Sequence, residues 1–182
     1  MELKELTTDR LKLRIVTADT YNYIFENFND NKIKNFLGLE SDEALKEEKE
    51  KYTKGVTTYN RSFVHFYIIE PDTNKVIGWS GYHTWYTDHN RAEIGYSLFD
   101  DTHKRKGYMS ELLPVLLQYG FETMKLYRIE AFVGKDNSPS KRLMDKFNFI
   151  KEGHLREHYC NKSTGIMEDS LVYSLLQHEY NK

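Results

Sequence analysis

The sequence predicts one α/β domain with a mixed β-sheet. Three segments between residues 62 and 99 have the composition of strands and follow one another across short turns, as in an antiparallel meander. After residue 107 the hydrophobic pattern changes, and helical and extended segments alternate to the end of the chain. The length of 182 residues fits one domain, because single cores stop growing only beyond roughly 250–300 residues. We therefore expect residues 1–182 to form a single α/β domain.

The N-terminal part predicts one strand and two helices. Residues 11–15 alternate apolar and basic side chains, which predicts a strand. Residues 19–29 carry an aromatic stripe that is typical of a short helix. Residues 41–54 begin with Ser41, a good N-cap, and continue with acids in the first turn and lysines in the last, the order that a helix dipole favours.

The rest of the chain predicts six strands and two helices. In order, these are strands at 62–70, 75–86 and 91–99, a helix at 107–125, a strand at 127–133, a helix from Ser138, and two final strands joined by the turn NKSTG. Pro114 cannot donate to the carbonyl of Ser110, so we expect a kink there. Ser138 is a good N-cap, and Pro139 suits the first helical position.

The composition narrows the class of protein. The net charge is −2, so there is no basic excess for coating nucleic acid or an anionic membrane. No apolar run approaches the roughly 20 residues that cross a bilayer, and MELKELTTDR lacks the apolar core of a secretion signal. Cys160 is the only cysteine, which excludes an internal disulfide and is typical of a reducing compartment. We expect a cytoplasmic protein that binds neither nucleic acid nor membrane.

A cationic loop precedes the predicted helix at 107–125. The stretch HKRKGYMSEL places Lys104, Arg105 and Lys106 directly before Gly107. The first N–H groups of a helix have no partner inside it, and a glycine lets a ligand approach the backbone closely. A solvated loop and a phosphate-binding loop both fit this pattern. The loops of nucleoside triphosphate and dinucleotide sites do not, since one glycine satisfies neither G-x-x-x-x-G-K-[ST] nor G-x-G-x-x-G.

Several segments resemble the GCN5-related N-acetyltransferases (GNAT). The cationic loop resembles their pyrophosphate loop, [QR]-x-x-G-x-[GA], with Gly107 matching and with Lys104 and Met109 replacing the other two residues. Four segments resemble, in order, the RimJ/RimL-like branch, which acetylates protein N-termini: ELTTDRLKLR, AEIGYSLFDDTHKRKGYMSE, VGKDNSPSKRLMDKFNFIKEG and MEDSLVYSLLQHEY. The similarity runs from about residue 6 to residue 180.

The resemblance implies the GNAT fold, a mixed, mostly antiparallel central sheet flanked by about four helices. Its fourth and fifth strands splay apart and hold acetyl-coenzyme A in the gap. The residues implied at the pantetheine arm are Ser97, Leu98 and Phe99, through their backbone, and Asn137 and Ser140 toward the sulfur. The implied pyrophosphate loop is Lys104, Arg105, Lys106, Gly107, Tyr108, Met109 and Ser110. The cations implied near the 3′-phosphate are Lys104, Arg105, Lys141 and Arg142.

Acetyl transfer to an amine requires a neutral amine and a proton for the leaving thiolate. Glu93 is our candidate base, directly or through water, because it shares a strand face with Gly95 and Ser97 beside the implied arm. The alternative is an ordinary strand glutamate in an ion pair. Many relatives place a tyrosine seven residues after the motif asparagine, but that position is Met144 here. The RimJ/RimL-like pattern that the chain resembles implies Ser140 at the sulfur instead, by hydrogen bonding.

Other reactive residues favour structural interpretations. His154 and His158 lack a companion ligand, so we predict no metal site, and Cys160 has no evident base beside it. An aromatic cluster is typical of a core, although its outer face could line an acceptor groove: Trp79, Tyr82, Trp85 and Tyr86.

Two classes of function remain open from the sequence. The first is an acetyl-coenzyme A-dependent N-acetyltransferase, with the N-terminal α-amine of a protein, ribosomal or other, as the preferred acceptor. A small-molecule amine, such as a polyamine or an antibiotic, is the alternative acceptor. The second class is a non-catalytic coenzyme A-binding module, which the missing tyrosine and the replaced loop residues leave open. The acceptor and the oligomeric state, a homodimer included, stay open.

Overall fold

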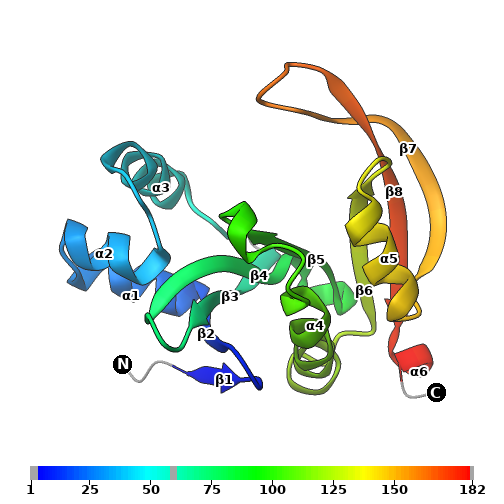
Figure 1. The fold of residues 1–182 in the computed structure, drawn as a ribbon, viewed down its shortest axis with the longest axis horizontal. Coiled ribbons are helices and arrows are strands. Elements are labelled where there is room, and N and C mark those ends of the chain that lie inside the picture. The colour runs from blue at the N-terminus through cyan, green and yellow to red at the C-terminus, as the bar shows by residue number, and fades with distance from the viewer. Residues whose placement is uncertain (1–3, 58–60, 181–182) are drawn as a thin grey trace.

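The computed structural model describes residues 4–57 and 61–180, which build one eight-stranded sheet with helices around it (Figure 1). Its strands are β1 (Glu5–Thr7), β2 (Lys12–Thr17), β3 (Arg61–Glu70), β4 (Lys75–Tyr86), β5 (Arg91–Leu98), β6 (Arg128–Gly134), β7 (Ile150–Cys160) and β8 (Met167–Leu176). Its helices are α1 (Ala18–Asn27), α2 (Asp30–Leu37), α3 (Asp42–Lys54), α4 (Tyr108–Gln118), α5 (Ser138–Lys146) and α6 (Gln177–Tyr180).

The sheet has the strand order β1-β2-β3-β4-β5-β6-β8-β7, and β5–β6 is the parallel pair within it. That pairing is confined to Arg91–Glu93 opposite Arg128–Glu130. Beyond these residues the two strands diverge, and Figure 1 shows β6, β7 and β8 standing apart from the strands up to β5. The predicted mixed, mostly antiparallel α/β sheet with a splayed pair at 91–99 and 127–133 is therefore confirmed.

Side chains of the central strands alternate between two hydrophobic cores. Phe66 and Ile94 belong to the core on the face that α4 covers, whereas Tyr67 belongs to the core beneath α1, α2 and α3. Burial of alternate residues on opposite faces is what the strand period of two requires. Because Ala92 and Ile94 point toward α4, Glu93 lies on the face that α1–α3 cover.

All four predicted helices are present, but two details differ. The helix expected at 107–125 is α-helical to Gln118, and a π-helical turn follows at Tyr119–Thr123. The α geometry therefore continues past Pro114 and changes only later. Asn137, not Ser138, caps α5, because the Asn137 Oδ1 accepts the Ser140 N–H at 3.1 Å. By contrast Ser41 caps α3 as predicted, accepting the Ala44 N–H at 3.0 Å.

Three short elements were not predicted: β1, α2 and α6. The α2 helix carried recognisable signals at both ends. Asn29 caps it by accepting the Lys32 N–H at 3.0 Å, and Gly38 ends it with a left-handed φ of 70°. Its buried residues Ile33, Phe36 and Leu37 have helical spacing.

Candidate active site

The divergence of β5 from β6 leaves an edge of β5 open. On one side β5 pairs with β4 as far as Leu98, whereas on the other side pairing to β6 stops after its first three residues. Ser97 is exposed on this segment. The Phe99 N–H already donates to the Ile77 carbonyl at 3.0 Å, so Phe99 keeps only its carbonyl for a ligand. The edge can thus pair with an extended molecule through its backbone groups.

The predicted phosphate loop forms the N-terminus of α4. Gly107 is the N-cap residue with a left-handed φ of 81°, and no side chain of the described chain caps the helix. The first amides of α4, from Tyr108 to Ser110, therefore lack a capping acceptor. Among described atoms, a Cβ at Gly107 would come within 4 Å only of the Arg10 guanidinium, at 3.6 Å. Free amides at an open helix start suit an anion.

Arg10, in the turn before β2, fastens this loop. Its guanidinium pairs with Glu111 at 2.6 Å and donates to the Lys106 carbonyl at 3.0 Å. It also lies over the Tyr108 ring, 4.8 Å from the ring centre. Thr8 donates to the same Glu111 carboxylate at 2.5 Å. The shape of the loop thus depends on a residue near the N-terminus, 101 positions before Glu111, and sequence reasoning missed this role of Arg10.

The cations around the loop are not equivalent. Lys104 pairs with Asp101 at 2.5 Å. Arg105 adopts a left-handed φ of 60° directly before the helix start. Arg105, Lys106 and Arg142 are exposed, and no ion pair within residues 4–57 and 61–180 engages them. These three remain available to phosphate oxygens.

On the far side of the gap, α5 brings Ser140 to Tyr96. Tyr96 lies on β5, and Ser140 lies in the first turn of the helix that follows β6. Burial raises the pKa of Tyr96, and the neighbouring Ser140 hydroxyl offsets part of that rise. Met144 is buried in the core. Met144 occupies the position where many relatives have a tyrosine, so it cannot supply a phenol. Tyr96, which sequence reasoning did not consider, places one near Ser140 instead.

This set of groups fits the donor that the resemblance implies. Acetyl-coenzyme A has an extended amide-containing arm, a pyrophosphate and a further phosphate. The open edge of β5 matches the extended arm, and the uncapped start of α4 matches the pyrophosphate. The exposed cations match the further phosphate.

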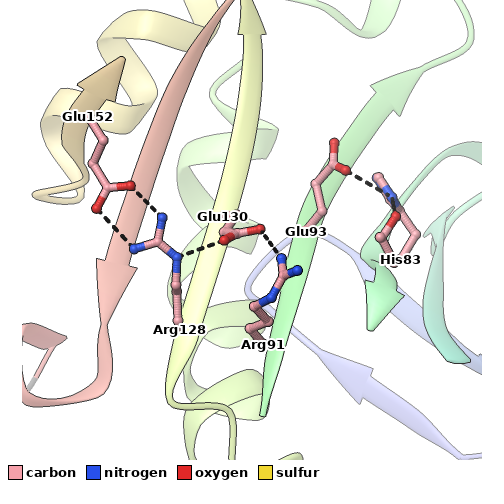
Figure 2. Close-up of polar contacts among 7 residues, drawn as sticks. His83, Arg91, Glu93, Arg128, Glu130 and Glu152 are labelled. Atoms are coloured by element: carbon pink, nitrogen blue, oxygen red, sulfur yellow. Dashed lines mark hydrogen bonds and ion pairs between the residues drawn. The ribbon is translucent and has the colours of Figure 1, made fainter. Parts of the chain in front are cut away.

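Glu93 faces His83 across the β4–β5 pair. The two residues are register partners, and the Glu93 Oε2 lies 3.5 Å from the His83 Nδ1 (Figure 2). That nitrogen is also 3.3 Å from the Thr84 hydroxyl. The His83 ring packs over Gly95, where any Cβ would collide with its Nε2. His83 is a further site residue that the sequence did not indicate.

A chain of ion pairs runs beside Glu93 without including it. Arg91 donates to Glu130 at 2.9 Å, and Arg128 joins Glu130, at 2.7 Å, to Glu152 (Figure 2). These residues tie β5, β6 and β7 together at the end of the gap where β5 and β6 pair. Within the described residues, the arginines satisfy Glu130 and Glu152 and none reaches Glu93.

Burial gives Glu93 the protonation behaviour of a base at neutral pH. Its side chain is 22% exposed. Loss of hydration raises the pKa of Glu93 from 4.5 to about 7, and the charge of Glu130 adds to the rise. Burial lowers the pKa of His83, so its ring does not offset that rise with a positive charge. A carboxyl with such a pKa exchanges protons readily near neutrality, as a general base must.

A cavity of about 810 Å³ opens on the α1–α3 face of the sheet. His83 lines it and thereby connects it to Glu93. Its aromatic lining residues are Tyr21, Phe63, Tyr67, Trp79 and Phe99, and its charged ones are Glu48, Lys51, Lys54 and Arg61. Of the aromatic cluster predicted from the sequence, Trp79 lines this cavity, whereas Tyr82 is fully buried in the α4-side core. The volume suits an organic acceptor.

The other reactive residues have ordinary surroundings. His154 lies 2.8 Å from the Asp169 carboxylate, His158 lies 3.0 Å from the Ser170 hydroxyl, and Cys160 is exposed. No trio of His, Cys, Asp or Glu side chains in the described ranges is arranged to hold a metal ion. None of the described helices is long and apolar enough to span a membrane.

Comparisons with known proteins identify the same family that the sequence resembles. A family model described as the acetyltransferase (GNAT) domain matches residues 10–150. YoaA of Bacillus subtilis, an uncharacterized N-acetyltransferase, is 35% identical over 94% of this chain and 96% of its own. A dodecameric spermidine N-acetyltransferase from Vibrio cholerae superposes with a TM-score of 0.68 at 25% identity, over 94% of this chain and 96% of that one. A proposed ribosomal-protein-serine acetyltransferase from Vibrio cholerae has the same fold, with a TM-score of 0.64 at 23% identity over 95% and 97% of the two chains.

Proposed function

Because this chain belongs to the GNAT acetyltransferase family, we propose that its acceptor is the N-terminal α-amine of a protein. Membership fixes the reaction class: the protein is an N-acetyltransferase whose acetyl donor is acetyl-coenzyme A. The finer assignment to the RimJ/RimL-like branch is part of the proposal.

We assign the donor to the gap between β5 and β6. When bound, its thioester supplies the acetyl group. The proposed arm-binding residues are Ser97, Leu98 and the carbonyl of Phe99, with Asn137 and Ser140 toward the sulfur. The proposed pyrophosphate site consists of the amides from Gly107 to Ser110, with Lys104, Arg105 and Lys106 around them and Arg142 near the further phosphate. No metal is part of this proposal.

Proton transfers are divided between the two faces of β5. Glu93, on the α1–α3 face, takes the proton that the acceptor ammonium must lose. Ser140 and Tyr96, on the opposite face, hold a hydroxyl proton for the leaving sulfur. The group that accepts the amine proton is therefore separate from the groups that protonate the sulfur. Tyr96 and Ser140 supply the hydroxyl that Met144 lacks.

The raised pKa of Glu93 supports this choice of acceptor. Moving a proton from an α-amine, with pKa near 7.7–8.0, to a base with pKa about 7 costs about 1 kcal/mol. The same step from an alkyl amine, with pKa about 10.4, costs nearly 5 kcal/mol. Glu93 is thus matched to an α-amine.

A small-molecule amine is the second candidate, and the similarity to the Vibrio cholerae spermidine N-acetyltransferase favours it. A non-catalytic coenzyme A-binding module has less support, because the raised pKa of Glu93 suits a base and Tyr96 and Ser140 offer hydroxyl protons. We further propose that residues 1–182 act as one domain and that the exposed thiol of Cys160 belongs in a reducing cytoplasm. A homodimer is a further proposal, and the dodecamer of the Vibrio cholerae enzyme is the precedent for self-assembly in a similar protein.

The test combines binding with turnover. Acetyl-coenzyme A should raise the melting temperature, since a ligand selective for the folded state stabilises it. Free thiol release should then be measured with peptides that have a free α-amine, the same peptides with a blocked α-amine and an internal lysine, and spermidine. Turnover of the free α-amine alone is the expected result. A melting shift without turnover of any amine would support the binding module instead, and faster turnover of spermidine would support the small-molecule candidate.

A further inference from the structure

We propose that the acceptor is an acidic N-terminal segment, with apolar side chains next to the amine and a carboxylate roughly three residues further along. This inference rests on the proposed function and on the cavity beside Glu93.

The negative charge in the cavity is already satisfied. Glu48 is the lining carboxylate among the described residues, and its side chain is 15% exposed. It accepts from the Tyr21 hydroxyl at 2.6 Å and pairs with Lys51 at 2.7 Å. Glu48 and Lys51 together therefore add no net charge for an acceptor to meet.

Two positive charges remain. Lys54 and Arg61 line the cavity, are exposed, and take part in no ion pair within the described ranges. Residues 58–60 lie outside those ranges and read Thr-Tyr-Asn, so they carry no charge. Burial lowers the pKa of His65 to about 4 and lowers that of His83, so neither ring adds a charge at neutral pH. The cavity therefore presents a net positive field to its acceptor.

The strand register places one of these cations relative to Glu93. Arg61 pairs with Tyr86 on β4, and Tyr86 pairs with Arg91 on β5, two positions from Glu93. Two strand spacings and two residue rises separate the Arg61 and Glu93 backbones by roughly 12 Å. An extended peptide covers that distance in roughly three residues.

The rest of the cavity lining determines which side chains the acceptor can carry next to its amine. The cavity wall between Glu93 and the cations is aromatic, with Trp79 and Phe63 packing around His65. Apolar side chains following the amine can bury there. A polyamine would instead place its additional ammonium groups against Lys54 and Arg61, where like charges repel.

The inference is tested with three peptides that differ only at positions three and four, which carry two aspartates, two asparagines or two lysines. All have a free α-amine, and thiol release at low salt gives kcat/KM. Each exposed charge pair changes affinity by up to roughly fivefold, so we expect kcat/KM to fall roughly tenfold from the aspartate to the lysine peptide. The difference should shrink at high salt.

The matched variants are Lys54→Glu with Arg61→Glu, and Lys46→Glu as a control on the same helix as Lys54 but outside the cavity. The double variant should prefer the lysine peptide, whereas Lys46→Glu should keep the wild-type order. The melting shift with acetyl-coenzyme A should be the same in all of them, which reports intact folding.

Equal kcat/KM for the three peptides would overturn the inference while leaving the proposed function standing. A wild-type preference for the lysine peptide would overturn it as well. Failure of the proposed function looks different, because the donor then binds and either no amine is turned over or spermidine is turned over faster than every peptide.

Discussion

Replacing Glu93 by glutamine should make the protein more stable at alkaline pH, although it removes the proposed base. The folded pKa of Glu93 is about 7, whereas a solvated glutamate has 4.5. The carboxyl is therefore favourable to the fold below pH 4.5, and this contribution is lost as pH rises through 7. The full rise corresponds to at most about 3 kcal/mol of penalty on the ionised form. Glutamine keeps the shape and never ionises, so Glu93→Gln should equal the wild type at pH 4 and exceed it by up to that amount at pH 8.

Melting curves from pH 4 to pH 8.5 measure this difference. For a chain of this length a stability change of 1 kcal/mol moves the melting temperature by about 2–4 °C, so the gap at pH 8 should reach roughly 6–12 °C. Glu152→Gln is a control of opposite sign, because Arg128 holds the pKa of Glu152 at about 2. That variant should lose stability at neutral pH, and its deficit should vanish as the pH falls.

Activity gives the second half of the test. Loss of a general base lowers kcat/KM by roughly 10²–10⁴-fold, and the rise in kcat/KM near pH 7 should disappear with it. A Glu93→Gln protein that melts below the wild type at pH 8 would contradict the burial argument. A wild-type kcat/KM at pH 7 would contradict the catalytic role, whatever the melting curves show.

Three further changes probe the donor side. Gly107→Val should raise the dissociation constant for acetyl-coenzyme A at least tenfold in calorimetry, because it strains a φ of 81° and fills the phosphate site, whereas Gly165→Val, with a φ of 70° and open space around it, should not. Arg10→Ala should raise that constant severalfold without changing KM for the amine, since it releases the loop from Glu111; an unchanged constant would mean that the loop holds its shape alone. Tyr96→Phe should lower kcat and leave donor binding intact, and adding Ser140→Ala should cost little more if the two hydroxyls act as a unit; fully additive losses would separate their roles.

The elements of this fold follow from local sequence, but the site depends on how they pair. The strands and the helix caps such as Ser41 are set by neighbours in sequence, so alternation and capping preferences predict them. His83 reaches Glu93 only through the β4–β5 register, which shifts after His83 at an irregularity before Tyr86. A register shift moves side chains between faces and leaves no periodic signal.

Contacts between residues of different elements could not be predicted from local sequence patterns, for the same reason. Arg10 and Glu111 form an ion pair although 101 positions separate them in the sequence, and Tyr96 and Ser140 come from elements on opposite sides of the gap. The raised pKa of Glu93 also has a tertiary cause, because burial removes its hydration and the charge of Glu130 on the neighbouring strand adds to the rise. The α2 helix is a different case, since Asn29 and Gly38 marked its ends locally.

The short contact between β5 and β6 also has a consequence for the empty enzyme. A sheet that divides after three paired residues presents bare strand edges, the kind of surface on which other chains add and aggregate. An occupant of the gap with its own amide groups would act as a missing strand and cover those edges. We therefore expect coenzyme A to protect the protein from aggregation whether or not it carries an acetyl group. The concentration of coenzyme A would then affect both the amount of folded protein and the rate of acetyl transfer.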